Sequence, residues 1–251
     1  GKQTDTAVTA TGFALAKKLR KIGVKAGVCD GFIGNRILAH YRKTAAYLVL
    51  DGAHPQQVDQ ALENFGFAMG PHKVTDLAGL DIDWMTRKRK AATRPKEERY
   101  SGDIADRICE SGWLGRKSGK GYYLYDERYI QLNPDIDIVI DAERQKAGIT
   151  VQKFENKEIV ERYITAMISE AVRVLEEQIA ARPLDVDMVF LFGYGFPRHR
   201  GGPLHYADRL GPQELIRRIE TYAKEDSHYW KVPDMLRQMA SDGTKFSDLN
   251  G

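Results

Sequence analysis

The chain has 251 residues, of which 42% are hydrophobic and 29% charged, a composition typical of a globular protein with one large or two small domains. Its formal net charge of +3 is too small to indicate a nucleic-acid-binding protein, and no apolar run reaches the ~18–20 residues of a membrane helix. Cys29 and Cys109 lack the spacing of metal ligands, so we expect free thiols in a reducing compartment.

The N-terminal residues predict one helix followed by one strand. Residues 4–21 carry apolar side chains at helical spacing, with Thr4 as candidate N-cap, and residues 24–28 form a short apolar run suited to a strand. One helix and one strand do not make a domain, but they are typical of the last step of a parallel sheet. We therefore expect residues 1–29 to be the remnant of a domain whose other strands lie upstream, with Gly1 as a cut end.

Beyond residue 30 the patterns predict an almost entirely helical protein. Apolar periodicity, prolines at helix starts and glycines at helix ends define the elements. Helices are expected at residues 36–50, 55–64, 74–83, 103–110, 134–147 and 156–181, and from Pro183, Pro212 and Pro233 onward.

Two stretches of the chain repeat one pattern, roughly 130 residues apart. The repeated residues are Pro55, Val58, Asp59, Gly66, Phe67, Pro71, Asp76 and Gly79 in the first copy and Pro183, Val186, Asp187, Gly195, Phe196, Pro203, Asp208 and Gly211 in the second. A unit that repeats once can bury its apolar face against its copy, as the subunits of a two-fold dimer do. We expect two tandem helical domains, at residues 30–126 and 156–251, joined by a linker at 127–155 and packed as a pseudo-dimer.

Asn35 is the first candidate site residue. It follows Gly31 and Gly34 in a turn that leads from the predicted strand into a helix. Ligands bind beyond the carboxyl ends of parallel strands, and an amide there can donate to a substrate carbonyl. The simpler alternative, that Asn35 only caps the helix, is left open by the spacing.

Two basic segments are weaker candidates. The loop at 115–121 has the composition of a phosphate loop without the P-loop spacing, so a surface turn is favoured over a lysine that reaches an anionic cofactor. The segment at 87–99 is interrupted by Glu97 and Glu98 and lacks interleaved aromatic residues, which favours a solvated face or a surface near CoA phosphates. The six histidines show no metal-binding spacing, and no metal site is expected.

The motifs at 30–36, 66–81 and 114–123, in this order, resemble the 3-hydroxyacyl-CoA dehydrogenase family. The second repeat, with its loop at 193–203, is similar to the multifunctional β-oxidation proteins of that family. The resemblance covers essentially the whole chain. It implies a mainly α protein with two helical domains like the C-terminal domain of 6-phosphogluconate dehydrogenase, preceded by the end of a truncated Rossmann domain.

The same resemblance implies the NAD-dependent oxidation of a 3-hydroxyacyl-CoA in fatty-acid β-oxidation. The family's glycine-rich NAD fingerprint and its catalytic histidine and glutamate would lie upstream of Gly1, so the chain alone is expected to be inactive. Asn35 matches the family's active-site asparagine, in a supporting role, and Lys117 matches the lysine that approaches NAD. The implied partners are an acyl-CoA substrate, upstream NAD-binding and enoyl-CoA hydratase domains, and a thiolase subunit.

Two interpretations of other classes stay open. One is a non-catalytic helical dimerisation or scaffold module with the same fold. The other is an RNA-binding protein, which rests only on the basic segment at 87–99. The C-terminal residues 249–251 are not the Ser-Lys-Leu address of peroxisomes, so we expect the cytoplasm of a bacterium.

Overall fold

The computed structural model describes residues 1, 3–127 and 129–251, and these residues are mainly helical, as predicted. The chain forms two compact units. Unit 1 comprises Gly1–His40, Ile164–Glu225 and Trp230–Gly251, and unit 2 comprises Tyr41–Tyr163 and Asp226–Tyr229. The two longest helices, α2 (Gly34–Asp51) and α8 (Asn156–Glu176), contribute residues to both units.

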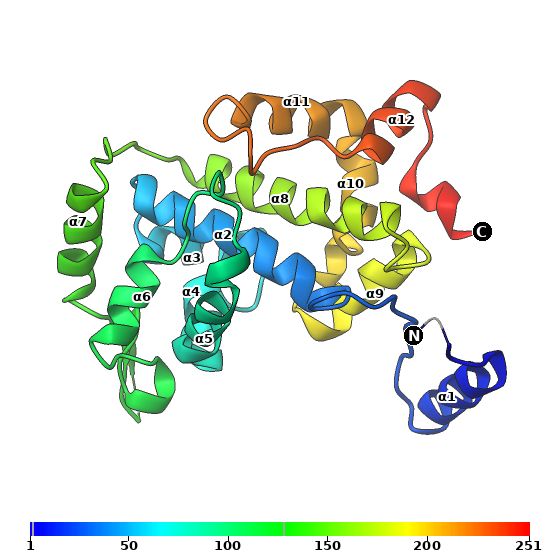
Figure 1. The fold of residues 1–251 in the computed structure, drawn as a ribbon, viewed down its shortest axis with the longest axis horizontal. Helices are drawn as coiled ribbons and strands as arrows, with labels where there is room; N and C mark the ends of the chain where they lie inside the picture. Colours follow the sequence, from blue (N-terminus) through cyan, green and yellow to red (C-terminus); the bar gives the residue numbers. More distant parts are fainter. Residues whose placement is uncertain (2, 128) are drawn as a thin grey trace. The chain divides into compact units, whose positions relative to one another are not determined.

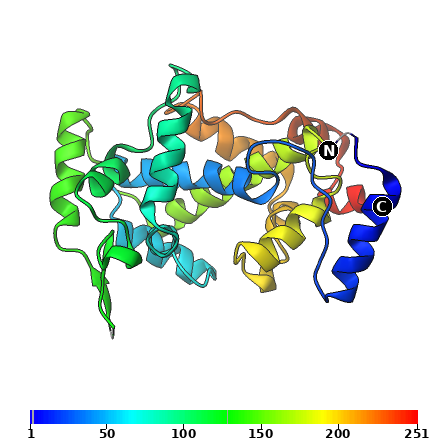
Figure 2. The same cartoon turned by 60° about the horizontal axis from the view of Figure 1, so that its bottom comes forward.

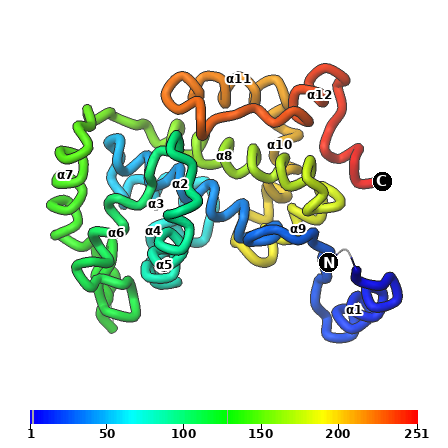
Figure 3. The backbone as a smooth tube through the Cα atoms, in the orientation of Figure 1, coloured from blue at the N-terminus to red at the C-terminus, as the bar shows by residue number. Residues whose placement is uncertain are grey.

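Unit 1 contains the N-terminal part of α2 and the C-terminal part of α8 (Figure 1). Its other helices are α1 (Thr6–Lys18), α9 (Pro183–Gly193), α10 (Pro203–Leu210), α11 (Pro212–Tyr222) and α12 (Asp234–Asp242), with 3-10 turns η3 (Arg198–Arg200) and η4 (Phe246–Asn250). Figure 3 traces the chain from α9 through the loop that precedes α10. The core of the unit includes Phe190, Leu204, Leu215 and Leu236, all fully buried. Each such side chain contributes roughly 1.5–3 kcal/mol by leaving water.

Unit 2 contains the rest of α2 and the start of α8. Its other elements are α3 (Pro55–Phe65), α4 (Pro71–Ala78), α5 (Leu80–Lys90), η1 (Ala91–Thr93), α6 (Asp103–Glu110), η2 (Arg116–Ser118), β1 (Tyr123–Tyr125), β2 (Ile130–Leu132) and α7 (Ile136–Lys146). The two strands form an antiparallel hairpin (Figure 2). In its register Tyr123 pairs with Leu132. Val58, Ile108 and Ile136 are fully buried in the core of this unit.

The sequence repeat corresponds to a repeated pattern of hydrogen bonds at the start of α4 and α10. Asp59 accepts the backbone amides of His72 and Lys73 at 2.9 and 3.2 Å. Asp187 accepts the two equivalent amides of α10 at 2.7 and 3.1 Å. Each carboxylate therefore satisfies two of the amides that a helix start leaves without an intrahelical partner, while the repeated proline occupies the first helical position.

The second repeated aspartate fastens the far end of the same helices. Asp76 in α4 accepts the backbone amides of Tyr122 and Tyr123 at 3.1 and 2.9 Å. Asp208 in α10 accepts two backbone amides of η4 at 2.7 and 2.9 Å. Both repeats thus keep two aspartates because each uses one of them at either end of the same helix.

The N-terminal elements differ from their prediction. Helix α1 is capped by Asp5, whose side chain accepts the Ala7 amide at 2.7 Å, rather than by Thr4, and no residue of α1 is buried. Residues 24–28 are not a strand, and only Ala26 makes a single β-bridge. An apolar run becomes a strand only when a neighbouring strand pairs with it, and the described residues supply none there.

Other boundaries moved for local reasons. The helix predicted at 74–83 is two helices, because Gly79 adopts φ +98° between them. Helix α8 ends at Glu176 instead of 181, shortly before Gln178 at φ +56°. Helix α10 and the β1–β2 hairpin were not predicted. The domain boundaries and the pseudo-dimer packing stay predictions.

Candidate functional site

The loop before α2 is a tight turn that sets the position of Asn35. Gly31 and Phe32 have φ angles of +84° and +50°, in the left-handed region. A Cβ atom on Gly31 would lie 2.6 Å from the backbone nitrogen of Arg36, so the turn requires glycine there. The Cys29 thiol donates to the Phe32 carbonyl at 3.3 Å and closes the loop. Asn35 follows in the first turn of α2.

The Asn35 side chain is held by a tyrosine from the second repeat. The Tyr194 hydroxyl donates to Asn35 Oδ1 at 2.7 Å. Asn35 is the second residue of α2, and its oxygen accepts from this side chain, so Asn35 does not act as the helix cap. The residue is exposed, and the described residues give its amide nitrogen no hydrogen-bond partner. The amide nitrogen is therefore a donor open to a ligand.

Arg36 fastens the same loop to the end of α8. Its Nε donates to Glu170 at 2.7 Å, and its two terminal nitrogens donate to the two oxygens of Glu177 at 2.5 and 2.7 Å. The hydrogen bond with Glu177 raises the pKa of Arg36, and the hydrogen bond from Arg36 lowers the pKa of Glu177. The two-pronged contact fixes the direction of the guanidinium, and with it the first turn of α2.

Lys117 lies in unit 2, whereas Asn35 lies in unit 1. Lys117 is in η2 after Gly115, which has φ +86° and whose Cβ would clash with the backbone of Asp76. Its ammonium forms an ion pair with Asp81 and its side chain is 48% exposed. The hydrogen bond from Lys117 lowers the pKa of Asp81.

A buried polar cluster in unit 2 was not predicted as such. The carboxylate of Asp59 also accepts the Tyr123 hydroxyl at 2.7 Å and pairs with His72 Nδ1 at 3.0 Å. Burial acts to raise the pKa of Asp59, but the charge and hydrogen bonds of His72 bring it below its ordinary value. Burial raises the pKa of Asp76 to about 6 and that of Asp187 to about 7. Asp59 and Asp76 of unit 2 and Asp187 of unit 1 accept backbone amides at or next to the ends of α4 and α10.

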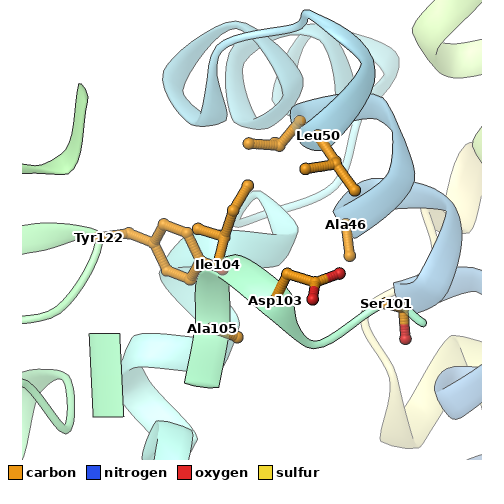
Figure 4. Close-up of a pocket in the computed structure, with 8 residues that line it drawn as sticks. Ala46, Leu50, Ser101, Asp103, Ile104, Ala105 and Tyr122 are labelled. Carbon is orange, nitrogen blue, oxygen red and sulfur yellow. The ribbon is translucent and has the colours of Figure 1, made fainter. Parts of the chain in front are cut away.

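Two cavities among the described residues of unit 2 do not contain the candidate residues. The small one, between α2, α6 and Tyr122, has a volume of about 10 Å³, which is room for about one water molecule (Figure 4). The larger one is an open cleft of about 390 Å³ between α3 and the hairpin. Its lining includes Gln56, Gln60 and Lys73. Neither cavity is lined by Lys117.

The residues of this chain do not fit a complete nucleotide or metal site. The sequence has no G-x-G-x-x-G loop, and the charge of Lys117 is already matched by Asp81. In the described part of the chain, no three His, Cys, Asp or Glu side chains are arranged to hold a metal ion. No helix there combines the length and apolar character of a membrane span.

Comparison with known families agrees with these local features. The model for the 3-hydroxyacyl-CoA dehydrogenase C-terminal domain matches residues 31–125 and 159–246, which is more than half of the chain. The chain belongs to this family. Both Asn35 and Lys117 lie in the first matched segment, and Tyr194 lies in the second. The family resemblance inferred from the three sequence motifs is confirmed.

Several similar proteins are named as bifunctional or multifunctional enzymes. The peroxisomal bifunctional enzyme of Danio rerio is 38% identical over 97% of this chain and 36% of its own length. The fatty acid oxidation complex subunit alpha of Shewanella halifaxensis is 36% identical over 98% of this chain and 34% of its own length. The chain thus spans about a third of these relatives. The dehydrogenase part of multifunctional enzyme 1 from C. elegans has a TM-score of 0.71 at 26% identity, over 95% of this chain and 54% of that one.

The sequence pointed to Asn35 and Lys117 as candidate site residues, and both stay predictions, whereas Tyr194 was not singled out. Asn35 was chosen because it follows a glycine-rich turn at the start of a helix, and Lys117 was assigned a role through the family resemblance. Tyr194 lies 159 residues from Asn35, in the loop at 193–203, and nothing in that loop's sequence gives the tyrosine a role at Asn35. One signal was available. Gly34, at the first residue of α2, carries no Cβ atom and so leaves room for another group to approach the backbone.

Proposed function

We propose that this chain supplies the helical C-terminal part of an NAD-dependent (S)-3-hydroxyacyl-CoA dehydrogenase of fatty-acid β-oxidation. Family membership and the β-oxidation relatives support the proposal. In it, NAD and the catalytic histidine–glutamate pair belong to a domain upstream of these residues, and an enoyl-CoA hydratase domain precedes that one. The chain alone is inactive, and its role is to close the cleft over the acyl-CoA and to form the dimer-like interface between its two repeats.

The observation that carries the proposal is the donor geometry of Asn35. Its oxygen is used by Tyr194 and its exposed amide nitrogen is left to donate. A rigidly held donor can hold the oxygen of an acyl-CoA substrate against a general base, which lowers the entropic cost of reaching the transition state. Hydride transfer is the chemistry of the cofactor, and no part of that step is assigned to the residues described.

Lys117 has a supporting role in this proposal. Its side chain is 48% exposed and paired with Asp81, so it can exchange that carboxylate for a phosphate of NAD or CoA. We propose the bacterial cytoplasm as the location. The relatives include a bacterial oxidation-complex subunit as well as a peroxisomal enzyme. A thiolase subunit is proposed as partner on the family resemblance alone.

The test compares Asn35→Ala with Asn64→Ala, an exposed asparagine of α3, in the full-length protein that carries these residues. We expect Asn35→Ala to lower kcat/KM for NADH-dependent reduction of acetoacetyl-CoA about 100-fold, as loss of a preorganised donor does, and Asn64→Ala to leave it unchanged. The 251-residue chain alone should show no turnover. A full-length protein that folds without this activity would identify the chain as the non-catalytic scaffold module.

A further inference from the structure

We propose that Tyr194, which comes from the second repeat, is a positioning residue that fixes the Asn35 amide as a hydrogen-bond donor toward an oxygen atom of the ligand. The ligand-directed part of this inference rests on the proposed function of Asn35. The positioning itself rests on the geometry of unit 1 alone.

The orientation of the Asn35 amide nitrogen follows from the planar geometry of an amide. Oδ1 and Nδ2 of Asn35 are bonded to the same planar carbon, so fixing one of them fixes the other. The Tyr194 hydroxyl lies 2.7 Å from Oδ1, which is the ideal distance for an O–H···O hydrogen bond. Without that hydroxyl, the amide of this exposed side chain is free to turn over and present an acceptor instead.

Tyr194 is itself held by two contacts. Its ring stacks on Phe190, a fully buried core residue, with centroids 5.0 Å apart and an interplanar angle of 25°. The hydroxyl end of the ring lies close to Gly34, where a Cβ atom would be 2.2 Å from the Tyr194 ring. The glycine of the motif is thus explained by the tyrosine, because no other residue lets the ring approach so closely.

The backbone below the amide is attached to the second repeat as well. Arg36 donates to Glu170 and Glu177, and the Gly27 amide donates to the Ile179 carbonyl at 2.7 Å. Residues of the second repeat therefore contact both the Asn35 side chain and the segments on either side of it.

The arrangement determines what kind of atom can face Asn35. A donor held in this way favours a carbonyl or hydroxyl oxygen and rejects a ligand that offers only an N–H donor there. The 3-keto or thioester carbonyl of an acyl-CoA meets this requirement.

The first experiment uses the 251-residue chain and measures the mobility of the Asn35 side-chain amide, so it does not depend on enzymatic activity. Side-chain amide ¹⁵N relaxation of Asn35 is compared between wild type, Tyr194→Phe and Tyr129→Phe. Tyr129→Phe is the matched control, because it removes the hydroxyl of a tyrosine that is 71% exposed. Phenylalanine keeps the stacked ring and removes only the hydroxyl. We expect the Asn35 amide to be rigid in wild type and control and mobile in Tyr194→Phe. An amide that stays equally rigid in Tyr194→Phe overturns the inference.

The second experiment is a double-mutant cycle in the full-length enzyme. Tyr194→Phe should lower kcat/KM about 3–10-fold, which corresponds to loss of one hydrogen bond. In the Asn35→Ala background the same change should have no further effect, since the group it positions is gone. Additive losses would mean that Tyr194 acts on stability and not through Asn35. If Asn35→Ala leaves activity intact while the amide is locked, the proposed function fails and only the positioning stands.

Discussion

Replacing Asp59 by alanine gives a sharp test of how the repeated aspartates act. Asp59 is fully buried and accepts four hydrogen bonds, from the backbone amides of His72 and Lys73, the ring of His72 and the hydroxyl of Tyr123. Asp59→Ala leaves all these donors without an acceptor in the interior of unit 2. Asp187→Ala, the matching change in the second repeat, removes the acceptor of only two backbone amides.

The expected magnitudes follow from these partners. A buried polar group that loses its partner costs about 1–3 kcal/mol, and removal of one member of a buried charged pair costs about 3–5 kcal/mol. We therefore expect Asp59→Ala to lower the free energy of unfolding by about 3–5 kcal/mol. For Asp187→Ala, where two helix-start amides lose their acceptor, we expect about 2–3 kcal/mol.

Urea unfolding followed by circular dichroism measures the total loss, and hydrogen exchange of the α4 and α10 amides reports each unit separately. Asp141→Ala is the control, because Asp141 is a 76% exposed surface residue and its loss should change stability by less than about 0.5 kcal/mol. The reasoning is refuted if Asp187→Ala is the more damaging change, or if Asp59→Ala resembles the control.

Three further outcomes are expected. Burial raises the pKa of Asp187 to about 7, so between about pH 4 and 7 the folded protein binds a proton that the unfolded chain has lost. The free energy of unfolding should therefore fall as the pH rises from about 4 to 7. Asp187→Asn should reduce this pH dependence by up to about 1.4 kcal/mol per pH unit, as measured by urea unfolding at several pH values. Gly34→Ala should lower the melting temperature and displace Tyr194, and a crystal structure with an unmoved ring would contradict the packing argument. Arg36→Met should destabilise unit 1 by about 1–3 kcal/mol, because it removes one ion-pair partner of Glu170, whose side chain is only 11% exposed to water. Arg237→Met, at an ion pair more than half exposed, is the control and should change stability by under about 1 kcal/mol.

The parts of the fold that depend on local chemistry could be predicted from the sequence. Pro55 and Pro183 mark helix starts because proline fits the first helical position, and the periodic apolar residues mark the buried faces. The failure at 24–28 has the opposite cause, since a strand is defined by its neighbour and not by its own residues.

The candidate site also combines a local pattern with a contact that forms only on folding. Asn35 could be proposed from the sequence because its motif is contiguous. Its partner Tyr194 belongs to a different repeat and becomes a neighbour only after folding. The buried cluster at Asp59 was visible as a repeated residue, but its hydrogen bonds to Tyr123 and His72 were not, because the hairpin that carries Tyr123 has too short a strand pattern to detect.

The contact of the Tyr194 ring with Gly34 has an evolutionary consequence. A duplicated segment can drift when it is released from selection, but here the second copy carries the tyrosine that holds the Asn35 side chain of the first. Substitutions at position 194 should be accompanied by changes at 34 and 35 across homologous genes. A chimera that takes one repeat from a homologue should be defective unless the residues at these three positions come from the same parent.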